Sequence, residues 1–190
     1  TGKLKNVFQK EMQNPKASVF NVYTGKIERT LKNTLLMSMF DQILDIVYTE
    51  KIREDEGGTY GVSSNGSISR YPENQTILHI VYDTDQAQIE HPNTIVQKEL
   101  HEIAANGPRE ADFNKVKEFM NKKYSESIKE NSYWIGILST YYFYNEDNHT
   151  EYLDTLNAIT ANDVKKFAND LISQGNEIVV SMMPKEVEAE

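Results

Sequence analysis

Residues 52–62 read Ile52-Arg53-Glu54-Asp55-Glu56-Gly57-Gly58-Thr59-Tyr60-Gly61-Val62 and separate two sequence patterns. Before them, apolar residues between Thr30 and Arg53 recur at spacings of three and four, which predicts one long helix. After them, the side chains from Thr59 to Ser69 alternate in polarity, which predicts a strand. Gly57 and Gly58 lie at the turn, where a residue without Cβ adopts a positive φ most easily. The segment therefore joins the main helix to a strand.

Arg53 and Tyr60 lie on the two sides of this turn, and both side chains donate hydrogen bonds. A guanidinium and a phenol directed at one point would bind a peptide carbonyl, or the oxyanion that it becomes on hydrolysis. Each residue also has a structural explanation. In the last turn of a helix, the charge of Arg53 interacts favourably with the helix dipole and its side chain can cap free carbonyls. Tyr60 is a common core residue in a strand. Spacing alone leaves both interpretations open.

The rest of the chain predicts strands towards both ends and helices between them. Further strands are predicted at Lys3–Lys10, Ser18–Tyr23, Thr76–Asp83 and Glu177–Met183, with residues 59–69 and 76–83 forming an antiparallel hairpin. Further helices are predicted from Pro92 to Asn106, from Glu110 to Ile128, from Thr150 to Asn157 and, after an N-cap at Thr160-Ala161-Asn162-Asp163, up to Ile172. This order predicts an α+β fold with helices on one face of a mainly antiparallel sheet. We expect residues 1–190 to form a single domain with a disordered tail at 185–190.

Residues 132–144 are rich in aromatic side chains, among them Tyr133, Trp134, Tyr141 and Tyr142. Trp134, Tyr141 and Tyr142 keep helical spacing, so we expect this segment to be a helix packed in the core. Stacking on a ligand is the alternative.

Composition excludes several kinds of function. The formal net charge of −9 disfavours nucleic acid and anionic membranes as partners, and no apolar run has the length and polarity of a membrane span. Cysteine is absent, which excludes disulfides and cysteine-ligated metal. The histidines lie too far apart in sequence for a His-x-x-Glu-His or His-x-x-x-His zinc motif; they are His79, His91, His101 and His149. We therefore expect no catalytic residue, metal ligand or cofactor in this chain.

Several segments resemble one protein family in their order and distances. They are Glu50 to Val62, Leu100-His101-Glu102-Ile103 with Gly107-Pro108 and Phe113, Glu130-Asn131-Ser132-Tyr133-Trp134, Ile159-Thr160-Ala161-Asn162-Asp163-Val164 and the strand that ends at Pro184. Together they resemble the C-terminal, non-catalytic domain of insulinase/pitrilysin-family zinc metallopeptidases, and most closely the bacterial pitrilysin-like enzymes. The resemblance implies an insulinase-family (LuxS/metallohydrolase-like) α+β domain.

The resemblance also implies a function. In this family the N-terminal half carries zinc on an inverted His-x-x-Glu-His motif, and the C-terminal half supplies an Arg and a Tyr that bind the substrate backbone. Arg53 and Tyr60 match that pair, with Gly57 and Gly58 turning the chain between them. No zinc ligand can be carried over, so this chain alone is not expected to hydrolyse peptides. Its expected partners are a peptide substrate and an N-terminal catalytic half or catalytic subunit that holds zinc.

Two other functions and the compartment remain open. The chain would also suit a non-enzymatic interaction subunit of the same fold that pairs with a catalytic partner, or a peptide-binding module with no protease ancestry. The resemblance indicates a bacterial protein, in the periplasm or cell envelope or in the cytoplasm.

Overall fold

The computed structural model describes residues 2–12, 16–55 and 61–185, without the side chains of residues 53–55. Over those residues it contains five strands and six α-helices. The strands are β1 (Lys3–Lys10), β2 (Ala17–Gly25), β3 (Val62–Ser69), β4 (Gln75–Thr84) and β5 (Asn176–Pro184). The helices are α1 (Leu31–Asp55), α2 (Glu90–Asn106), α3 (Glu110–Ser127), α4 (Asn131–Tyr144), α5 (Tyr152–Ala158) and α6 (Ala161–Ile172). The tail predicted after residue 185 lies outside the described residues.

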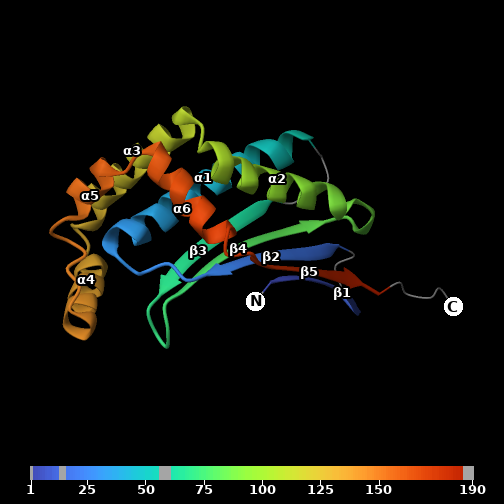
Figure 1. Ribbon diagram of the computed structural model, residues 1–190, viewed down its shortest axis with the longest axis horizontal. Coiled ribbons are helices and arrows are strands. Elements are labelled where there is room, and N and C mark those ends of the chain that lie inside the picture. The colour runs from blue at the N-terminus through green and yellow to red at the C-terminus, as the bar shows by residue number, and fades with distance from the viewer. Residues whose placement is uncertain (1, 13–15, 56–60, 186–190) are drawn as a thin grey trace.

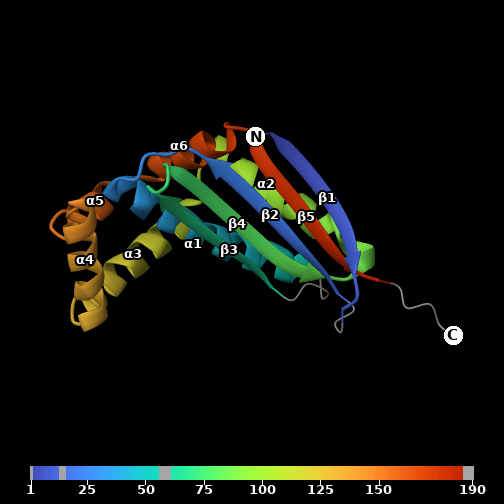
Figure 2. The same ribbon diagram turned by 90° about the horizontal axis from the view of Figure 1, so that it is seen from below.

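The strands form one mixed sheet in the order β1-β5-β2-β4-β3. β1 pairs with β5 in parallel, and the other neighbouring strands are antiparallel. The helical layer covers one face of the sheet (Figure 1), and the opposite face shows its strands uncovered (Figure 2). The predicted α+β fold, its mainly antiparallel sheet and the β3–β4 hairpin are therefore confirmed.

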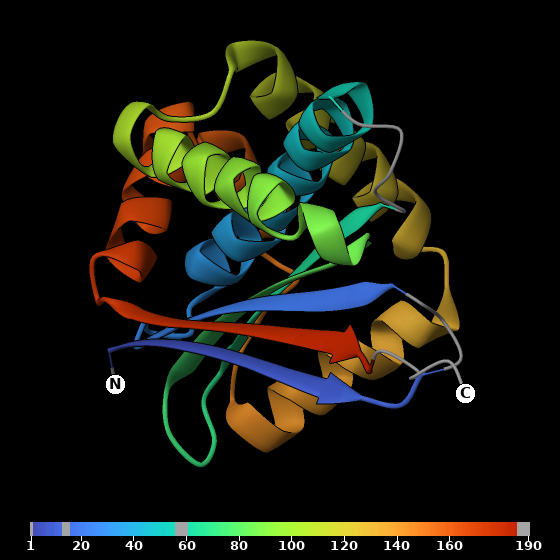
Figure 3. The ribbon, with the colours of Figure 1, turned by 90° about the vertical axis from the view of Figure 1, so that its right-hand side faces the viewer.

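Helix α1 is the centre of the core, stacked between the sheet and the other helices (Figure 3). Its apolar side chains recur at spacings of three and four residues and cover more than one side of the helix, so it is buried against both the sheet and the other helices. Four of its residues are fully buried: Met39, Phe40, Ile43 and Leu44. β2, β4 and most of β5 alternate as a half-covered sheet requires, whereas every residue of β1 is exposed. In β4, for example, each buried residue is followed by a more exposed one.

Close packing between α1 and β3 depends on one glycine. A Cβ at Gly66 would clash with the side chain of Met37, which is itself buried. The strand can therefore approach the helix only where a side chain is missing. This contact lies near the N-terminal end of α1 and holds β3 directly against that helix.

The prediction that the aromatic segment lies in the core is wrong. It is helical, as expected, and forms α4, but none of its residues is buried. The interior between sheet and helices is already filled by side chains of the other elements. α4 instead stands at one end of the molecule, beside α3 and α5 (Figures 1 and 2). Tyr142 and Phe143 are 80% and 82% exposed.

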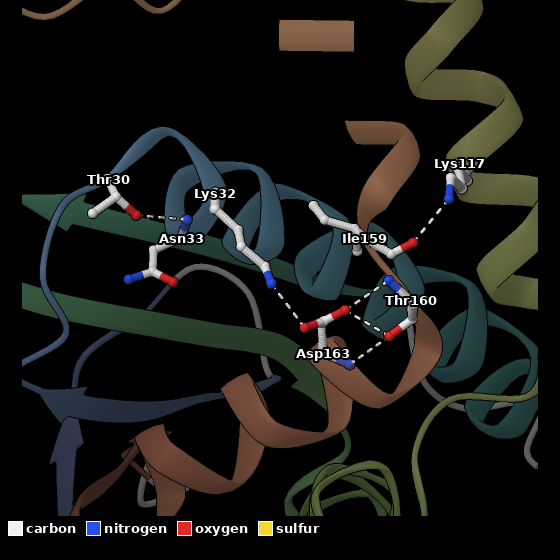
Figure 4. A network of polar contacts seen from close by, with 7 residues as sticks. All are labelled: Thr30, Lys32, Asn33, Lys117, Ile159, Thr160 and Asp163. Carbon is white, nitrogen blue, oxygen red and sulfur yellow. Dashed lines mark hydrogen bonds and ion pairs between the residues drawn. The ribbon is translucent and has the colours of Figure 1, made fainter. Parts of the chain in front are cut away.

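The start of α6 is fixed by the predicted N-cap (Figure 4). The Asp163 N–H donates to Thr160 Oγ1 at 3.2 Å, and the Thr160 N–H donates to Asp163 Oδ2 at 2.9 Å. Lys32 of α1 adds an ion pair to Asp163 at 2.8 Å, and Lys117 of α3 donates to the Ile159 carbonyl at 2.8 Å. This network ties the beginning of α6 to α1 and α3. Burial would raise the pKa of Asp163, but the bonds from Lys32 and Thr160 outweigh it and lower that pKa to about 2.

Asp163→Asn should destabilise the chain at neutral pH by about 1–2 kcal/mol, since it removes the charged half of the cap and the partner of Lys32. A lowered carboxyl pKa gives stability that is present above about pH 4 and is lost as the pH falls through about 2. Urea unfolding of the Asp163→Asn variant and of the unmodified chain at several pH values checks this. The difference between their free energies of unfolding should become smaller below about pH 4. A difference that stays constant with pH would contradict this account.

Candidate substrate-binding site

The segment between α1 and β3 contains residues predicted to bind substrate. α1 continues to Asp55 and β3 begins at Val62, so Arg53 belongs to the last turn of the helix, as predicted. The side chain of Arg53, and Gly57, Gly58 and Tyr60, lie outside the described residues. The approach of Arg53 to Tyr60 therefore stays a prediction. What the structure describes is the framework on both sides of them.

Arg109 holds the C-terminal part of α1 in place. Its guanidinium forms a bidentate ion pair with Glu50, which lies one helical turn before Arg53. One of the two hydrogen bonds runs from Arg109 Nη1 to Glu50 Oε1 at 2.7 Å. Its Nε donates to Oδ2 of the buried Asp112 at 2.6 Å. These hydrogen bonds lower the pKa of Glu50 and raise the pKa of Arg109, so both groups stay charged. The end of α1 is thereby bonded to the start of α3, which limits its movement.

Arg109→Met should lower the free energy of unfolding by about 1–3 kcal/mol, because the buried Asp112 loses its guanidinium partner. Lys122→Met, on the exposed side of α3, is the matched control and should change it by less than about 0.5 kcal/mol. Urea denaturation of the two variants gives the comparison. Equal midpoints would show that the Glu50–Arg109–Asp112 contacts add nothing to stability.

β3 is one of the two edge strands of the sheet, and β1 is the other. The edge of β3 is partly occupied, since the Ser64 N–H donates to Asp45 Oδ1 of α1 at 2.8 Å. The Ser64 hydroxyl also donates to the Asp41 carbonyl at 3.0 Å. A peptide adding to this edge as a further strand would find Ser64 already bonded.

Two surface hollows flank the ends of α1. One, of about 440 Å³, lies between α1 and α2 and is lined by charged and apolar side chains: Val47, Lys51, Lys98, Glu99, Glu102, Ile103, Gly107 and Arg109. The other is lined by Arg29, Ser69, Arg70, Tyr71 and Tyr144. Nothing in the sequence relates the five positions that line the second hollow, so no sequence pattern predicted it.

Two arginines share one carboxylate beside the second hollow. Arg29 and Arg70 contact Glu146 at 2.5 Å and 2.6 Å, and the Glu146 side chain is only 16% exposed. The rings of Tyr71 and Tyr144 stack at 5.6 Å between centroids. Two guanidiniums against one carboxylate leave one formal positive charge, so this hollow suits a carboxylate or another small anion.

Within residues 2–12, 16–55 and 61–185, no three His, Asp or Glu side chains are grouped as metal ligands. His149, for example, contacts the hydroxyls of Tyr124 and Tyr133 through its Nδ1, at 3.2 Å and 2.8 Å. In the same part of the chain, no helix has the length and apolar character needed to span a membrane.

Comparison with known proteins gives the family. A family model described as the peptidase M16 inactive domain matches residues 2–120, and a search of curated sequences gave no match. The periplasmic protease PqqL from Escherichia coli has a similar structure, with a TM-score of 0.84, 18% identity and coverage of 97% of this chain and 21% of that chain. A protease from Helicobacter pylori has a TM-score of 0.80 and 13% identity, with coverage of 95% of this chain and 44% of that chain. A peptidase M16 inactive domain from Pseudomonas fluorescens has a TM-score of 0.73 and 21% identity, with coverage of 100% of this chain and 45% of that chain.

The chain thus spans about a fifth of PqqL and less than half of the other two proteins. The likeness extends over nearly all of its own residues, and it includes the sheet and helical layer described above. The chain belongs to the peptidase M16 inactive-domain family, the non-catalytic C-terminal domain of insulinase-family peptidases.

Proposed function

We propose that this chain is the substrate-binding, non-catalytic C-terminal domain of a zinc metalloendopeptidase. In this proposal residues 1–190 are one domain of a larger protein, and zinc lies in its N-terminal half. Arg53 and Tyr60 donate hydrogen bonds to the carbonyl of an extended peptide and to the oxyanion that forms from it. Gly57 and Gly58 allow the turn that directs both side chains to one point.

The observation that carries this proposal is the arrangement around residues 56–60. A helix fixed by Arg109 precedes this segment, and an edge strand follows it. A fixed helix end is a suitable support for a guanidinium that must hold its position during a reaction. An edge strand next to it can align a peptide through its backbone. Both features support a peptide-binding role at this end of the domain.

The described residues do not fit a zinc site, because no three of their His, Asp and Glu side chains are grouped so that they could hold a metal ion. The metal would supply an activated water in another domain. The residues of this chain would bind and orient the peptide, and would stabilise negative charge on its carbonyl oxygen. None of them is assigned a proton-transfer role.

The test uses the full-length protein. Its gene should encode a His-x-x-Glu-His sequence in the same reading frame, upstream of residue 1. The purified protein should contain one zinc per polypeptide and cleave peptides in a chelator-sensitive manner. A reading frame without that motif, in a protein that assembles with a separate zinc peptidase, would instead support the interaction subunit. A zinc-free protein that binds peptides without such a partner would overturn both.

A further inference from the structure

One face of α4 is apolar and open to solvent. The α4 stripe consists of the five residues Trp134, Ile135, Leu138, Tyr141 and Tyr142. They follow the spacing i, i+1, i+4, i+7 and i+8, which places them on one side of a helix. Their exposed fractions run from 39% for Trp134 to 80% for Tyr142.

Tyr133 and Trp134 anchor the start of α4 to the rest of the domain. Tyr133 donates or accepts a hydrogen bond with His149 at 2.8 Å, and its ring packs edge-on against Tyr124 at 6.0 Å. Tyr124 in turn stacks on Tyr152 of α5 at 4.4 Å. The Trp134 indole N–H donates to the Ile128 carbonyl at 2.8 Å. These contacts fix the rotation of α4 and leave the other four residues of the stripe between 49% and 80% exposed: Ile135, Leu138, Tyr141 and Tyr142.

The composition of α4 is that of an interior helix. Its sequence, NSYWIGILSTYYFY, contains no charged residue. A helix that is apolar on most of its sides is normally buried. With their exposed fractions, the five residues of the stripe present roughly 550 Å², taking ~150–250 Å² for a whole side chain. The largest apolar patch on a typical monomer is about 300–600 Å² and is often functional, so the stripe lies at the upper end of that range. One side of a stable interface buries about 800 Å², of which the stripe would supply about two thirds.

We propose that the α4 stripe is the docking surface for another domain of the same polypeptide. The related solved proteins are two to five times as long as the part that this chain matches, so further chain is present in each of them. An uncharged apolar helix suits a permanent intramolecular contact better than a surface that must stay soluble between encounters. A second copy of the chain and a separate protein are the outcomes that the test must distinguish.

Docking at α4 is separate from peptide binding. α4 stands at one end of the molecule, whereas α1 ends and β3 begins towards the other (Figures 1 and 2). A domain bound to the stripe would therefore leave the turn after α1 accessible. The inference rests on family membership and on the exposure of α4, and not on the roles proposed for Arg53 and Tyr60.

Thiol labelling in the full-length protein tests the proposal. The described chain has no cysteine, so Leu138→Cys introduces one thiol in the stripe, and Glu118→Cys introduces one on the exposed side of α3 as a control. Labelling with a maleimide is followed by mass spectrometry of the peptides that contain each thiol. We expect the thiol of Leu138→Cys to react at least about tenfold more slowly than the thiol of Glu118→Cys. This protection from labelling should not change when the protein is diluted.

A pair of matched variants identifies the contact. Tyr142→Glu places a charge in the stripe and should restore fast labelling of Leu138→Cys. Phe143→Glu makes the same change one residue on, where the helix has turned by about 100°, and should leave the protection intact. Fast labelling without either variant would overturn the proposal. Protection that disappears on dilution, together with a dimer in light scattering, would overturn it in favour of a second copy. Equal effects of the two variants would also contradict it.

Discussion

Arg53→Ala in the full-length protein is expected to lower kcat/KM for peptide cleavage by about 100–1,000-fold. This is the usual cost of removing one donor to an oxyanion, and it corresponds to about 2.7–4 kcal/mol of transition-state stabilisation. Tyr60→Phe removes only the phenolic hydroxyl, so a loss with this variant would identify the hydrogen bond rather than the ring. Because no zinc ligand is assigned to this chain, both variants should retain the zinc content of the unmodified protein.

Lys51→Ala is the matched control for Arg53→Ala. Lys51 lies two residues earlier on α1 and is also a cation near the helix end. Its removal should change kcat/KM by less than about threefold, because it is not directed at the substrate. Unchanged kinetics in both Arg53→Ala and Tyr60→Phe would contradict the proposed role. An equal loss in Lys51→Ala would show that general positive charge, and not a directed donor, is what matters.

Phe40→Ala should lower the free energy of unfolding of the 190-residue chain by about 3–5 kcal/mol. Phe40 is fully buried at the middle of α1, and its ring meets Phe167 of α6 edge-on at 6.3 Å. The substitution leaves a cavity between the two helices and removes this aromatic contact. The measurement is the urea unfolding midpoint at a constant m-value.

Thr49→Ala is the control for this core substitution. Thr49 lies on the same helix but is exposed, so we expect a change of less than about 0.5 kcal/mol. A loss below about 1 kcal/mol for Phe40→Ala would mean that α1 and α6 close over the missing ring. That outcome would contradict the central place given to α1 in the core.

Local sequence signals predicted the elements whose structure depends on neighbours in the chain. A few neighbouring residues are enough to predict three of these elements: α1 from its helical period, β4 from its alternation and the start of α6 from the capping box at Thr160. The pairing of β1 with β5 is different, because it joins residues about 170 positions apart along the chain. Nothing local specifies that partner or its parallel direction.

The aromatic segment shows why burial is harder to predict than helix. The spacing of Trp134, Leu138 and Tyr141 is the same whether the partner surface lies inside this domain or in another one. Hydrophobicity indicates that a surface is covered, but it does not say by what. The prediction of a core helix failed for this reason. The exposed stripe that results is the feature behind the docking proposal.

The candidate site was found through resemblance more than through pattern. Spacing alone left Arg53 and Tyr60 with structural explanations, and only the similarity to insulinase-family peptidases selected the functional one. The structure adds the support around them, through Arg109, Glu50 and Asp112. Glu50 lies 59 residues before Arg109 and the three positions carry no motif, so the fold was needed to bring Glu50 to the other two.

Photo-crosslinking of a bound peptide tests the central claim most directly. The full-length protein is depleted of zinc so that the peptide stays intact, and the peptide carries a photoreactive group near its middle. We predict crosslinks within residues 50–64, at the end of α1 and the start of β3, that an unlabelled substrate peptide competes away. Crosslinks that are competed away but map only to other parts of the protein would contradict the claim that this domain binds the substrate.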